Sequence, residues 1–269
     1  MPFFRIQNVH EIPVQHEAAS VNRELLGDAK RAFSGKMLGT HRAIKNKWQF
    51  TTTWLVELEW RFLRALLEGE GHHWSFDSST EWKYSSKGMG PTSGTAANGS
   101  RYTTATKFGA GALSVTAGNY VQFNVGYSNE WTVMLWGATS SFANHYIVNN
   151  SSQKWVDGVR NDAASTPFIT MSSGNLRIGD TGAGAAQYFD DIVVIPEKIN
   201  ASWAEDLGVM SNAFSALPLI RVNGNFFLSQ DYYVRGFDVN VELSQGVVDG
   251  TWEANIGQVS ATLIEDSRI

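Results

Sequence analysis

The sequence of 269 residues predicts a mainly β protein with one strong helix. The chain contains 25 Gly and only 6 Pro, and aromatic residues make up 12% of it, a composition typical of strands joined by tight turns. Most of its apolar segments alternate apolar and polar residues, which is the period of a strand. Hydrophobic residues make up 43% and charged residues 17%, so the chain can bury a sizeable core.

Charge and glycine content divide the chain into three segments. Residues 1–72 contain 10 Lys and Arg against 8 Asp and Glu, residues 73–212 contain 8 against 11, and residues 213–269 contain 3 against 7. Glycine is distributed over them as 5, 15 and 5, so the middle segment is the richest in turns. We therefore expect domain boundaries near residues 73 and 212.

The one strong helix is expected in TTTWLVELEWRFLRALLEGEG, residues 51–71. Thr52 or Thr53 can cap its start, Gly69 can end it, and Glu57 and Arg61 form an i,i+4 pair. The apolar residues that recur at helical spacing are Trp54, Leu55, Leu58, Phe62, Leu63, Leu66 and Leu67.

Strands are expected on both sides of this helix and through the middle segment. In NYVQFNV, the apolar Val121 and Phe123 alternate with the polar Gln122 and Asn124. The run TVMLWGA is bulky on both faces, which predicts a strand buried between two sheets. The expected strands are residues 44–50, 72–77, 112–125, 130–138, 176–180 and 188–196, and those of the last segment are 217–229, 232–243 and 252–265.

Three short signals predict local structure. A helix is expected over residues 202–214, with Ser202 as N-cap and Glu205 completing a capping box. Asn223 and Gly224 lie between apolar runs and predict a hairpin. The stretch SQKWVDGVRND, residues 152–162, reads as a sugar or metal loop around Trp155 and Asp157, or as a two-residue hairpin at Asp157–Gly158. The hairpin is favoured, because Asp-Gly suits the two positive φ angles of a type I′ turn.

Five stretches of the middle segment, in this order, resemble a laminin-G-like domain, the concanavalin-A-like jelly-roll sandwich. They are KFGAGALSVTAGNYVQF (107–123), EWTVMLWGA (130–138), KWVDGV (154–159), LRIGD (176–180) and FDDIVVIP (189–196). The resemblance covers residues 73–212. Between the second and third stretches the family carries two more strands, and here only TSSFANHYIVNNSSQ remains, which implies a reduced sandwich.

The outer segments together resemble phage tail proteins of the distal-tail or tail-tube-related kind. The residues that carry this are KWQF (47–50), the helix through LLEGEGHHWSFD (66–77), LPLIRVNGNFF (217–227) and WEANIGQVSATLIE (252–265). The resemblance implies a small β-sandwich or barrel with one packed helix, formed by 1–72 and 213–269 and interrupted by the inserted domain. It also implies a virion protein that assembles with itself into a ring, with six-fold symmetry, and with other tail proteins.

Aromatic residues of the inserted domain are candidates for carbohydrate binding, because a flat ring can stack on the apolar face of a sugar. The candidates are Tyr146, Trp155 and Tyr188, and the alternative for each is packing in the core.

No metal site is predicted, although two Asp residues are weak calcium candidates. Asp180 lies in a Gly-rich loop and Asp190 in YFDDIVV, but Asp190 and Asp191 are adjacent on a strand and point to opposite faces. We expect one of the pair to be solvated and the other to hydrogen-bond a neighbouring turn. His72 and His73 are also adjacent on an expected strand, so their side chains point to opposite faces and cannot easily share a metal ion. No further Cys or His cluster follows that could supply the four ligands of a structural zinc site.

The sequence predicts no catalytic site and no cofactor. A glycosidase of this fold needs paired carboxylates on one strand face, whereas Glu57 and Glu59 lie in the expected helix. The formal net charge of −5 disfavours general nucleic-acid binding, and no sequence-specific nucleic acid is expected as a partner. A cluster of basic residues in the first segment is read by default as a solvated surface, and the alternatives in a ring-forming tail protein are contact with an acidic neighbouring subunit or with a DNA-carrying lumen. That cluster is Lys30, Arg31, Lys36, Arg42, Lys45 and Lys47.

We expect a structural bacteriophage virion protein of the distal tail ring or tail tip, carrying a lectin-like module that takes a host glycan. The alternatives are a free carbohydrate-binding lectin or adhesin and, less favoured, a glycan-degrading enzyme. Neither a secretory signal nor a membrane-spanning segment is expected, which is compatible with synthesis in the host cytoplasm. The resemblance to phage tail proteins implies a place in the virion.

Overall fold

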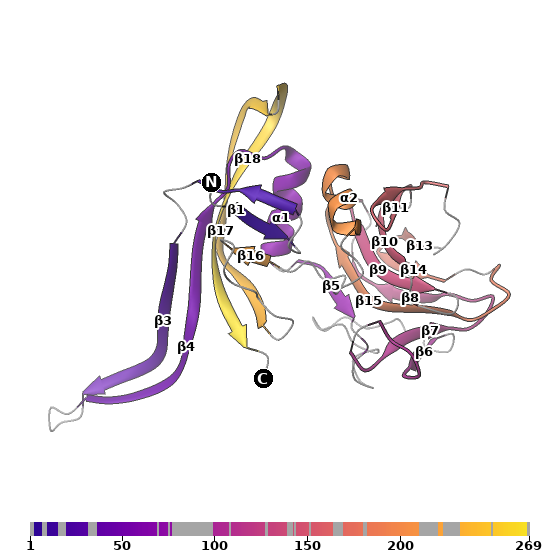
Figure 1. The fold of residues 1–269 in the computed structure, drawn as a ribbon, viewed down its shortest axis with the longest axis horizontal. Coiled ribbons are helices and arrows are strands. Elements are labelled where there is room, and N and C mark those ends of the chain that lie inside the picture. Colours follow the sequence, from indigo (N-terminus) through magenta and orange to yellow (C-terminus); the bar gives the residue numbers. More distant parts are fainter. Residues whose placement is uncertain are drawn as a thin grey trace. The chain divides into compact units, whose positions relative to one another are not determined.

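The computed structural model describes residues 3–6, 10–15, 20–31, 37–68, 70–74, 76, 99–107, 109–126, 129–138, 142, 144–150, 152–163, 169–179, 182–209, 220–222, 232–248 and 250–267. The chain is mainly β with two helices, which confirms the predicted fold class. It divides into two compact units, one comprising Met1–Gly69 with Leu219–Ile269 and the other Glu70–Pro218 (Figure 1). The boundaries expected from composition were near 73 and 212.

Unit 1 is built on a four-stranded antiparallel sheet in the order β17-β18-β4-β3. Its strands are β3 (Ser20–Arg31), β4 (Met37–Thr51), β17 (Tyr232–Val248) and β18 (Thr251–Ser267). A three-stranded sheet in the order β16-β1-β2 joins β1 (Phe3–Ile6), β2 (His10–Pro13) and β16 (Ile220–Val222). Both sheets therefore combine strands from the two ends of the sequence. The expected Asn223–Gly224 hairpin lies outside the described residues.

Helix α1 (Glu57–Glu68) packs on β17 and β18. Its side chains Phe62, Leu63, Ala65 and Leu67 are buried. Gly257 of β18 lies under Trp60, where a Cβ atom would come within 2.5 Å of the indole, so only glycine allows this approach. The expected Glu57–Arg61 pair is present at 3.5 Å.

The predicted cap of α1 at Thr52 or Thr53 is wrong. Thr52 instead forms a β-bridge with Val14, and its hydroxyl accepts a hydrogen bond from the amide of Val259 at 3.0 Å. The helix begins at Glu57, and the carbonyl of Val56 accepts the amides of Glu59 and Trp60. Sheet pairing therefore extends the strand-like backbone past the threonines.

Unit 2 is a β-sandwich. Its larger sheet has the order β12-β11-β10-β9-β15-β7-β6, with β5 also paired to β15, and its smaller sheet has the order β13-β14-β8. The strands of the larger sheet are β5 (His72–Trp74), β6 (Gly99–Tyr102), β7 (Ala112–Val115), β9 (Thr132–Ala138), β10 (Asn144–Asn149), β11 (Gln153–Val156), β12 (Val159–Arg160) and β15 (Gln187–Ile195). Those of the smaller sheet are β8 (Val121–Asn124), β13 (Ile169–Ser172) and β14 (Asn175–Ile178). Between β9 and β11 the described residues contain one strand, β10.

The core of unit 2 lies between the two sheets and follows the predicted alternation. Val121 and Phe123 of the smaller sheet are buried in it, whereas Gln122 is partly exposed and Asn124 is exposed. Strand β9 is buried on both faces, as expected, and Val133 and Leu135 form its core side. On its other side, Trp136 lies under the ammonium of Lys107, and the hydroxyl of Thr132 contacts the carbonyl of Glu197.

Helix α2 (Ala201–Val209) lies against β10, β11 and β12. The predicted N-cap at Ser202 is wrong, because Asn200 caps the helix: its side chain accepts the amide of Ser202 at 3.3 Å. A short polar residue two positions earlier thus satisfies one of the first free amides of the helix. At the other end, Gly208 approaches Gly158 so closely that a Cβ atom on Gly208 would lie 2.3 Å from the Gly158 nitrogen.

The stretch 152–162 forms a tight hairpin, which confirms the favoured interpretation. Val156 of β11 pairs with Val159 of β12, leaving Asp157 and Gly158 as a two-residue loop. Their φ angles of 50° and 79° are both positive, as a type I′ turn requires. Asp157 also exchanges two backbone-linked hydrogen bonds with His145 of β10, at 2.8 and 2.9 Å. The turn is therefore tied to the neighbouring strand.

Candidate functional site

Two of the three aromatic carbohydrate candidates are buried. Trp155 is 1% exposed and Tyr146 is 8% exposed. Tyr146 points into the sandwich core, while Trp155 pairs with Ile147 of β10 on a strand that α2 contacts. A stacking platform needs an open ring face, so neither residue provides one and the core-packing alternative holds for both.

The third candidate, Tyr188, is half-buried in β15. Its ring lies beside that of Tyr102 in β6, with centroids 4.5 Å apart and planes at 44°. The two tyrosines form one tilted aromatic pair at this surface. Tyr188 stays a candidate for sugar stacking.

The calcium candidates give no ligand cluster. Asp180 lies outside the described residues. The carboxylate of Asp190 is buried and accepts the amide of Lys107 at 2.7 Å, so this Asp bonds to a neighbouring loop, as expected for one of the pair. Asp191 is buried rather than solvated, at a φ of 52° where the register of β15 against β9 shifts. No three His, Cys, Asp or Glu among the described residues are grouped to hold a metal ion.

Of the two histidines in β5, His72 packs inside unit 2 and has a structural role. His72 is buried, and its Nε2 lies 3.4 Å from the carbonyl oxygen of Val125. Its ring stacks on that of Trp74, with centroids 5.4 Å apart. The side chain of His73 lies outside the described residues.

A largely buried cluster that the sequence did not indicate, His145, Trp136 and the partly exposed Lys107, lies on the face of the larger sheet away from the core. The ring of His145 is 5.3 Å from that of Trp136, and the ammonium of Lys107 lies 3.9 Å above the Trp136 ring. Burial lowers the pKa of His145 to about 4, with the charge of Asp191 raising it and that of Lys107 lowering it further. Neither ring nitrogen of His145 has a hydrogen-bond partner among the described residues. The imidazole is therefore neutral at neutral pH.

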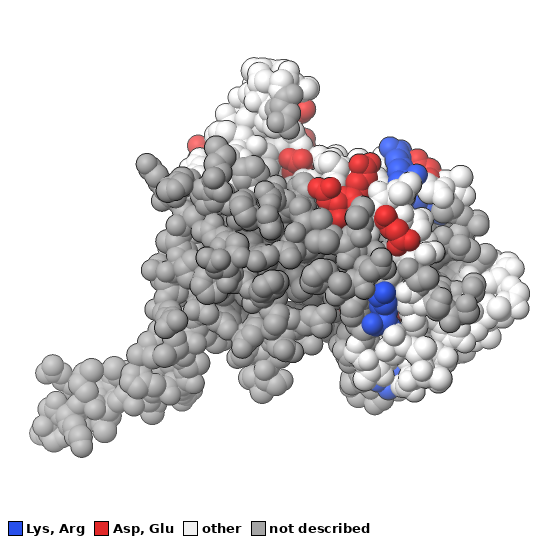
Figure 2. Space-filling view, viewed as in Figure 1, with Lys and Arg blue, Asp and Glu red and all other residues white. Residues whose placement is uncertain are grey.

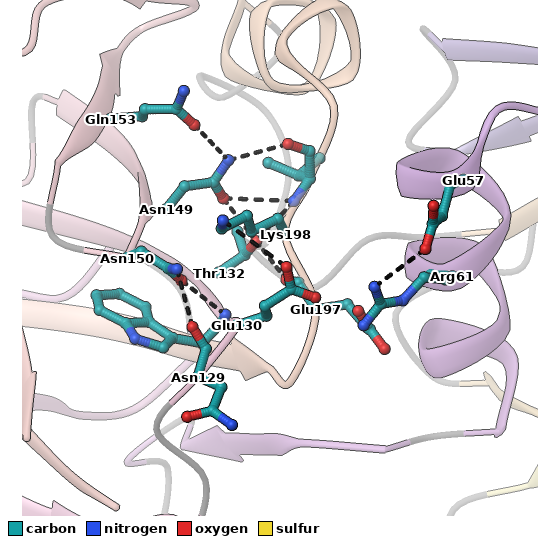
Figure 3. Close-up of polar contacts among 12 residues, drawn as sticks. Glu57, Arg61, Asn129, Glu130, Thr132, Asn149, Asn150, Gln153, Glu197 and Lys198 are labelled. Carbon is teal, nitrogen blue, oxygen red and sulfur yellow. Dashed lines mark hydrogen bonds and ion pairs between the residues drawn. The ribbon is translucent and has the colours of Figure 1, made fainter. Parts of the chain in front are cut away.

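A hydrogen-bonded junction joins the same sheet to the segment before α2 (Figure 3). Asn149 donates to the carbonyl of Ile199 at 2.9 Å and to the side chain of Gln153 at 3.3 Å. The Thr132 hydroxyl lies 2.7 Å from the carbonyl oxygen of Glu197 and accepts the amide of Ile199 at 2.9 Å. These contacts hold the segment before α2 against β9 and β10, so we assign them a structural role.

The outer face of the smaller sheet is polar and open. Facing residues across the three strands form two rows, Thr170–Arg177–Gln122 and Ser172–Asn175–Asn124. The guanidinium of Arg177 donates through Nε to the side chain of Gln122 at 2.8 Å and lies 4.8 Å from the centre of the Tyr120 ring. Amide, hydroxyl and guanidinium groups on one face are suited to a ligand rich in oxygen atoms. The alternation of apolar and polar residues in NYVQFN and SGNLRI is the sequence signal for this polar face. The candidates chosen from the sequence were Trp and Tyr residues, and none of them lies in the two rows.

Unit 1 has an exposed apolar pair at the end of its longest hairpin. Val247 of β17 faces Trp252 of β18, and the two side chains are 63% and 66% exposed. Leu243, on the same face of β17, is exposed as well.

Both helices in the described part of the chain fall short of the length and apolarity needed to cross a bilayer. Comparisons of the chain with protein-family models, with curated proteins and with solved structures find no match.

Proposed function

We propose that the chain is a structural protein of a bacteriophage virion, a ring-forming component of the distal tail or tail tip without catalytic activity. Its unit 2 is a lectin-like, laminin-G-like module that takes a host glycan. The resemblances described above motivate this proposal. The observation that supports it most is the four-stranded sheet of unit 1, whose two outer strands each pair on one side only among the described residues and belong to strand pairs of opposite charge.

The direction of the strands suits a head-to-tail assembly. Each neighbouring pair in the order β17-β18-β4-β3 is antiparallel, so β17 and β3 run in opposite directions. Each of them has a described neighbour on one side only, and an open edge offers unpaired amides and carbonyls to another chain. A second copy can therefore add its β3 antiparallel to β17. Repetition of such a heterologous contact closes into a ring where the rotation permits.

The two strand pairs that carry these edges, β17–β18 and β3–β4, have complementary charges. Residues 232–267, which comprise β17 and β18, contain six Asp and Glu and a single Arg. Residues 20–51, which comprise β3 and β4, contain seven Lys and Arg against two Asp and Glu. In Figure 2 the described end of the β17–β18 hairpin shows red and white atoms and none in blue. Opposite charges on two meeting surfaces speed association and set its orientation.

The length of the hairpin also supports assembly. Strands β17 and β18 have 17 residues each, whereas strands of globular proteins commonly have about 5–6. A two-stranded ribbon is at best marginally stable in water by itself, and this one exposes Val247 and Trp252. Contact with a neighbouring subunit would bury this pair and stabilise the ribbon.

The mass of the full-length protein in solution tests the proposal. Light scattering coupled to size-exclusion chromatography is expected to give a closed oligomer, with six copies as the resemblance implies, and electron microscopy should show rings. Reversal of charge at Glu242 and Glu253 to Lys should dissociate it, because both residues lie on the acidic hairpin. The same reversal at Glu205 and Asp206, which are exposed on α2, is the control and should leave the mass unchanged. A monomer at high protein concentration and low salt would refute the ring.

The alternative is a free lectin or adhesin, and the open polar face of the β13-β14-β8 sheet favours it as the second candidate. A monomer that binds glycans would support this alternative over the ring-forming virion protein. Turnover of a polysaccharide by the full-length chain would instead support the glycan-degrading enzyme.

A further inference from the structure

We infer that the outer face of the β13-β14-β8 sheet is the glycan-binding surface and that it takes an acidic saccharide, with the carboxylate on Arg177. The inference rests on the glycan-binding role proposed for unit 2. It places that role on a surface that contains none of Tyr146, Trp155 and Tyr188.

All the outward-facing residues in the two rows of this sheet are polar. Val121, Phe123 and Leu176 point into the core and are buried, so their strand neighbours must point outward. The six outward residues are Gln122, Asn124, Thr170, Ser172, Asn175 and Arg177, and each is exposed or partly exposed. Adjacent strands lie about 4.8 Å apart and alternate residues of a strand about 7 Å apart, so the two rows cover roughly 10 Å by 7 Å. That area matches a small saccharide lying flat on the sheet.

Arg177 is held in place before any ligand arrives. Its Nε donates to Gln122 Oε1 at 2.8 Å, and its guanidinium carbon lies 4.8 Å from the centre of the Tyr120 ring. Two restraints on one long side chain reduce the rotamer entropy that binding would otherwise cost. The terminal Nη1 and Nη2 donors have no partner among the described residues, and together they match the two oxygens of a carboxylate.

The other described arginines of unit 2 are already engaged by oxygen atoms. Arg160 forms an ion pair with Asp162 at 2.9 Å. Arg101 donates to the carbonyl oxygens of Phe76 and Ala110 at 2.6 and 2.8 Å. Arg177 contacts the neutral side chains of Gln122 and Tyr120 through Nε and its ring contact. Among the described residues its charge is therefore not paired with a carboxylate, and its terminal nitrogens are not occupied by carbonyl oxygens of the kind that the Arg101 side chain contacts. Its terminal nitrogens can therefore take an external anion.

The remaining residues of the face are suited to hydroxyl groups. Amide side chains both donate and accept, so Asn124 and Asn175 can each bind a sugar hydroxyl, and the hydroxyls of Thr170 and Ser172 can do the same. None of the six outward positions carries a carboxylate, so nothing on them repels an anion. A single Arg suits one carboxylate better than a polyanion such as nucleic acid, which needs many basic contacts.

The test measures binding of the full-length protein to immobilised 3′-sialyllactose and to lactose, which lacks the carboxylate. We expect binding to sialyllactose or, in a second arm, to a glucuronate-containing oligosaccharide, and at least tenfold weaker binding to the neutral sugar. Arg177→Met should abolish the preference, and Arg177→Lys should lose most of it, because an ammonium cannot form the paired contact. Arg160→Met is the matched control and should bind as the wild type does.

The outcomes separate this inference from the proposed function. Thermal unfolding and the mass in solution are measured on the same samples, and Arg177→Met should retain the values of the wild type. Equal binding of acidic and neutral sugars, no binding of either acidic probe, or unchanged binding by Arg177→Met would each overturn the inference while leaving ring formation untouched. A monomeric protein that binds acidic sugars through Arg177 would overturn the ring and retain the inference.

Discussion

Asn149 and Ile199 hold each other in a reciprocal contact. The side-chain nitrogen of Asn149 donates to the Ile199 carbonyl at 2.9 Å, and the Ile199 amide lies 3.3 Å from Asn149 Oδ1. Asn149 ends β10 and Ile199 precedes α2, so this one amide side chain joins the sheet to the helix. Both residues are buried, so water does not replace these bonds if they are lost.

Asn149→Leu is therefore expected to destabilise the protein by about 2–4 kcal/mol, since the buried backbone groups of Ile199 lose partners. Urea unfolding followed by tryptophan fluorescence measures this, because Trp203 in α2 is buried. Asn161→Leu, at an exposed position after β12, is the control and should change the stability by less than about 0.5 kcal/mol. Equal effects of the two substitutions would contradict the role given to Asn149.

Gly208→Ala should weaken the packing of α2 on the hairpin. The added methyl group would meet the Gly158 backbone, which cannot yield as a flexible side chain would. We expect a loss of about 1–3 kcal/mol in the free energy of unfolding. Gly184→Ala introduces the same methyl group where nothing lies within 4 Å, so its effect should be small. A stability unchanged by Gly208→Ala would mean that the helix moves away from the hairpin at little cost.

The buried imidazole of His145 should make stability depend on pH. Its pKa is lowered from 6.5 to about 4, mainly by burial, so between these values the unfolded chain binds more protons than the folded chain. Stability is then full above about pH 6.5 and falls as the pH falls toward 4, by about 3 kcal/mol in total and about 2 kcal/mol by pH 5. His145→Phe should remove this part of the dependence. Urea unfolding of both proteins between pH 7.5 and 5 checks it, and parallel pH profiles would argue against the assignment to His145.

The exposed pair Val247 and Trp252 should contribute to self-association. Replacing both with Ser removes apolar surface that the proposed ring buries, and we expect at least a tenfold weaker association with little change in the unfolding of the isolated subunit. Sedimentation velocity over a range of protein concentrations measures the change. Exposed Val159, in the short β12 of unit 2, is a suitable control when changed to Ser. The prediction fails if the double variant assembles like the wild type.

Local patterns in the sequence correctly predicted one turn and the buried face of one strand. The Asp157–Gly158 pair predicted its turn because the two positive φ angles depend on those two residues alone. The alternation around Val121 and Phe123 predicted which side of β8 is buried, since the period of two is a property of the strand itself. The helix caps at Thr52 and Ser202 failed for a different reason, because a competing bridge and a nearer Asn200 took their place.

The sequence by itself determined the mainly β class, the two helices, the hairpin and the alternating faces, because each arises from interactions between close neighbours in the chain. Only the tertiary structure decided that Trp155 and Tyr146 are buried, that Asp190 is bonded to the Lys107 amide, and that Arg177 lies over Tyr120 on an open sheet. These facts depend on contacts between strands that are far apart in the sequence. No local pattern encodes such contacts, since the exposure of a side chain is set by what the rest of the fold places against it.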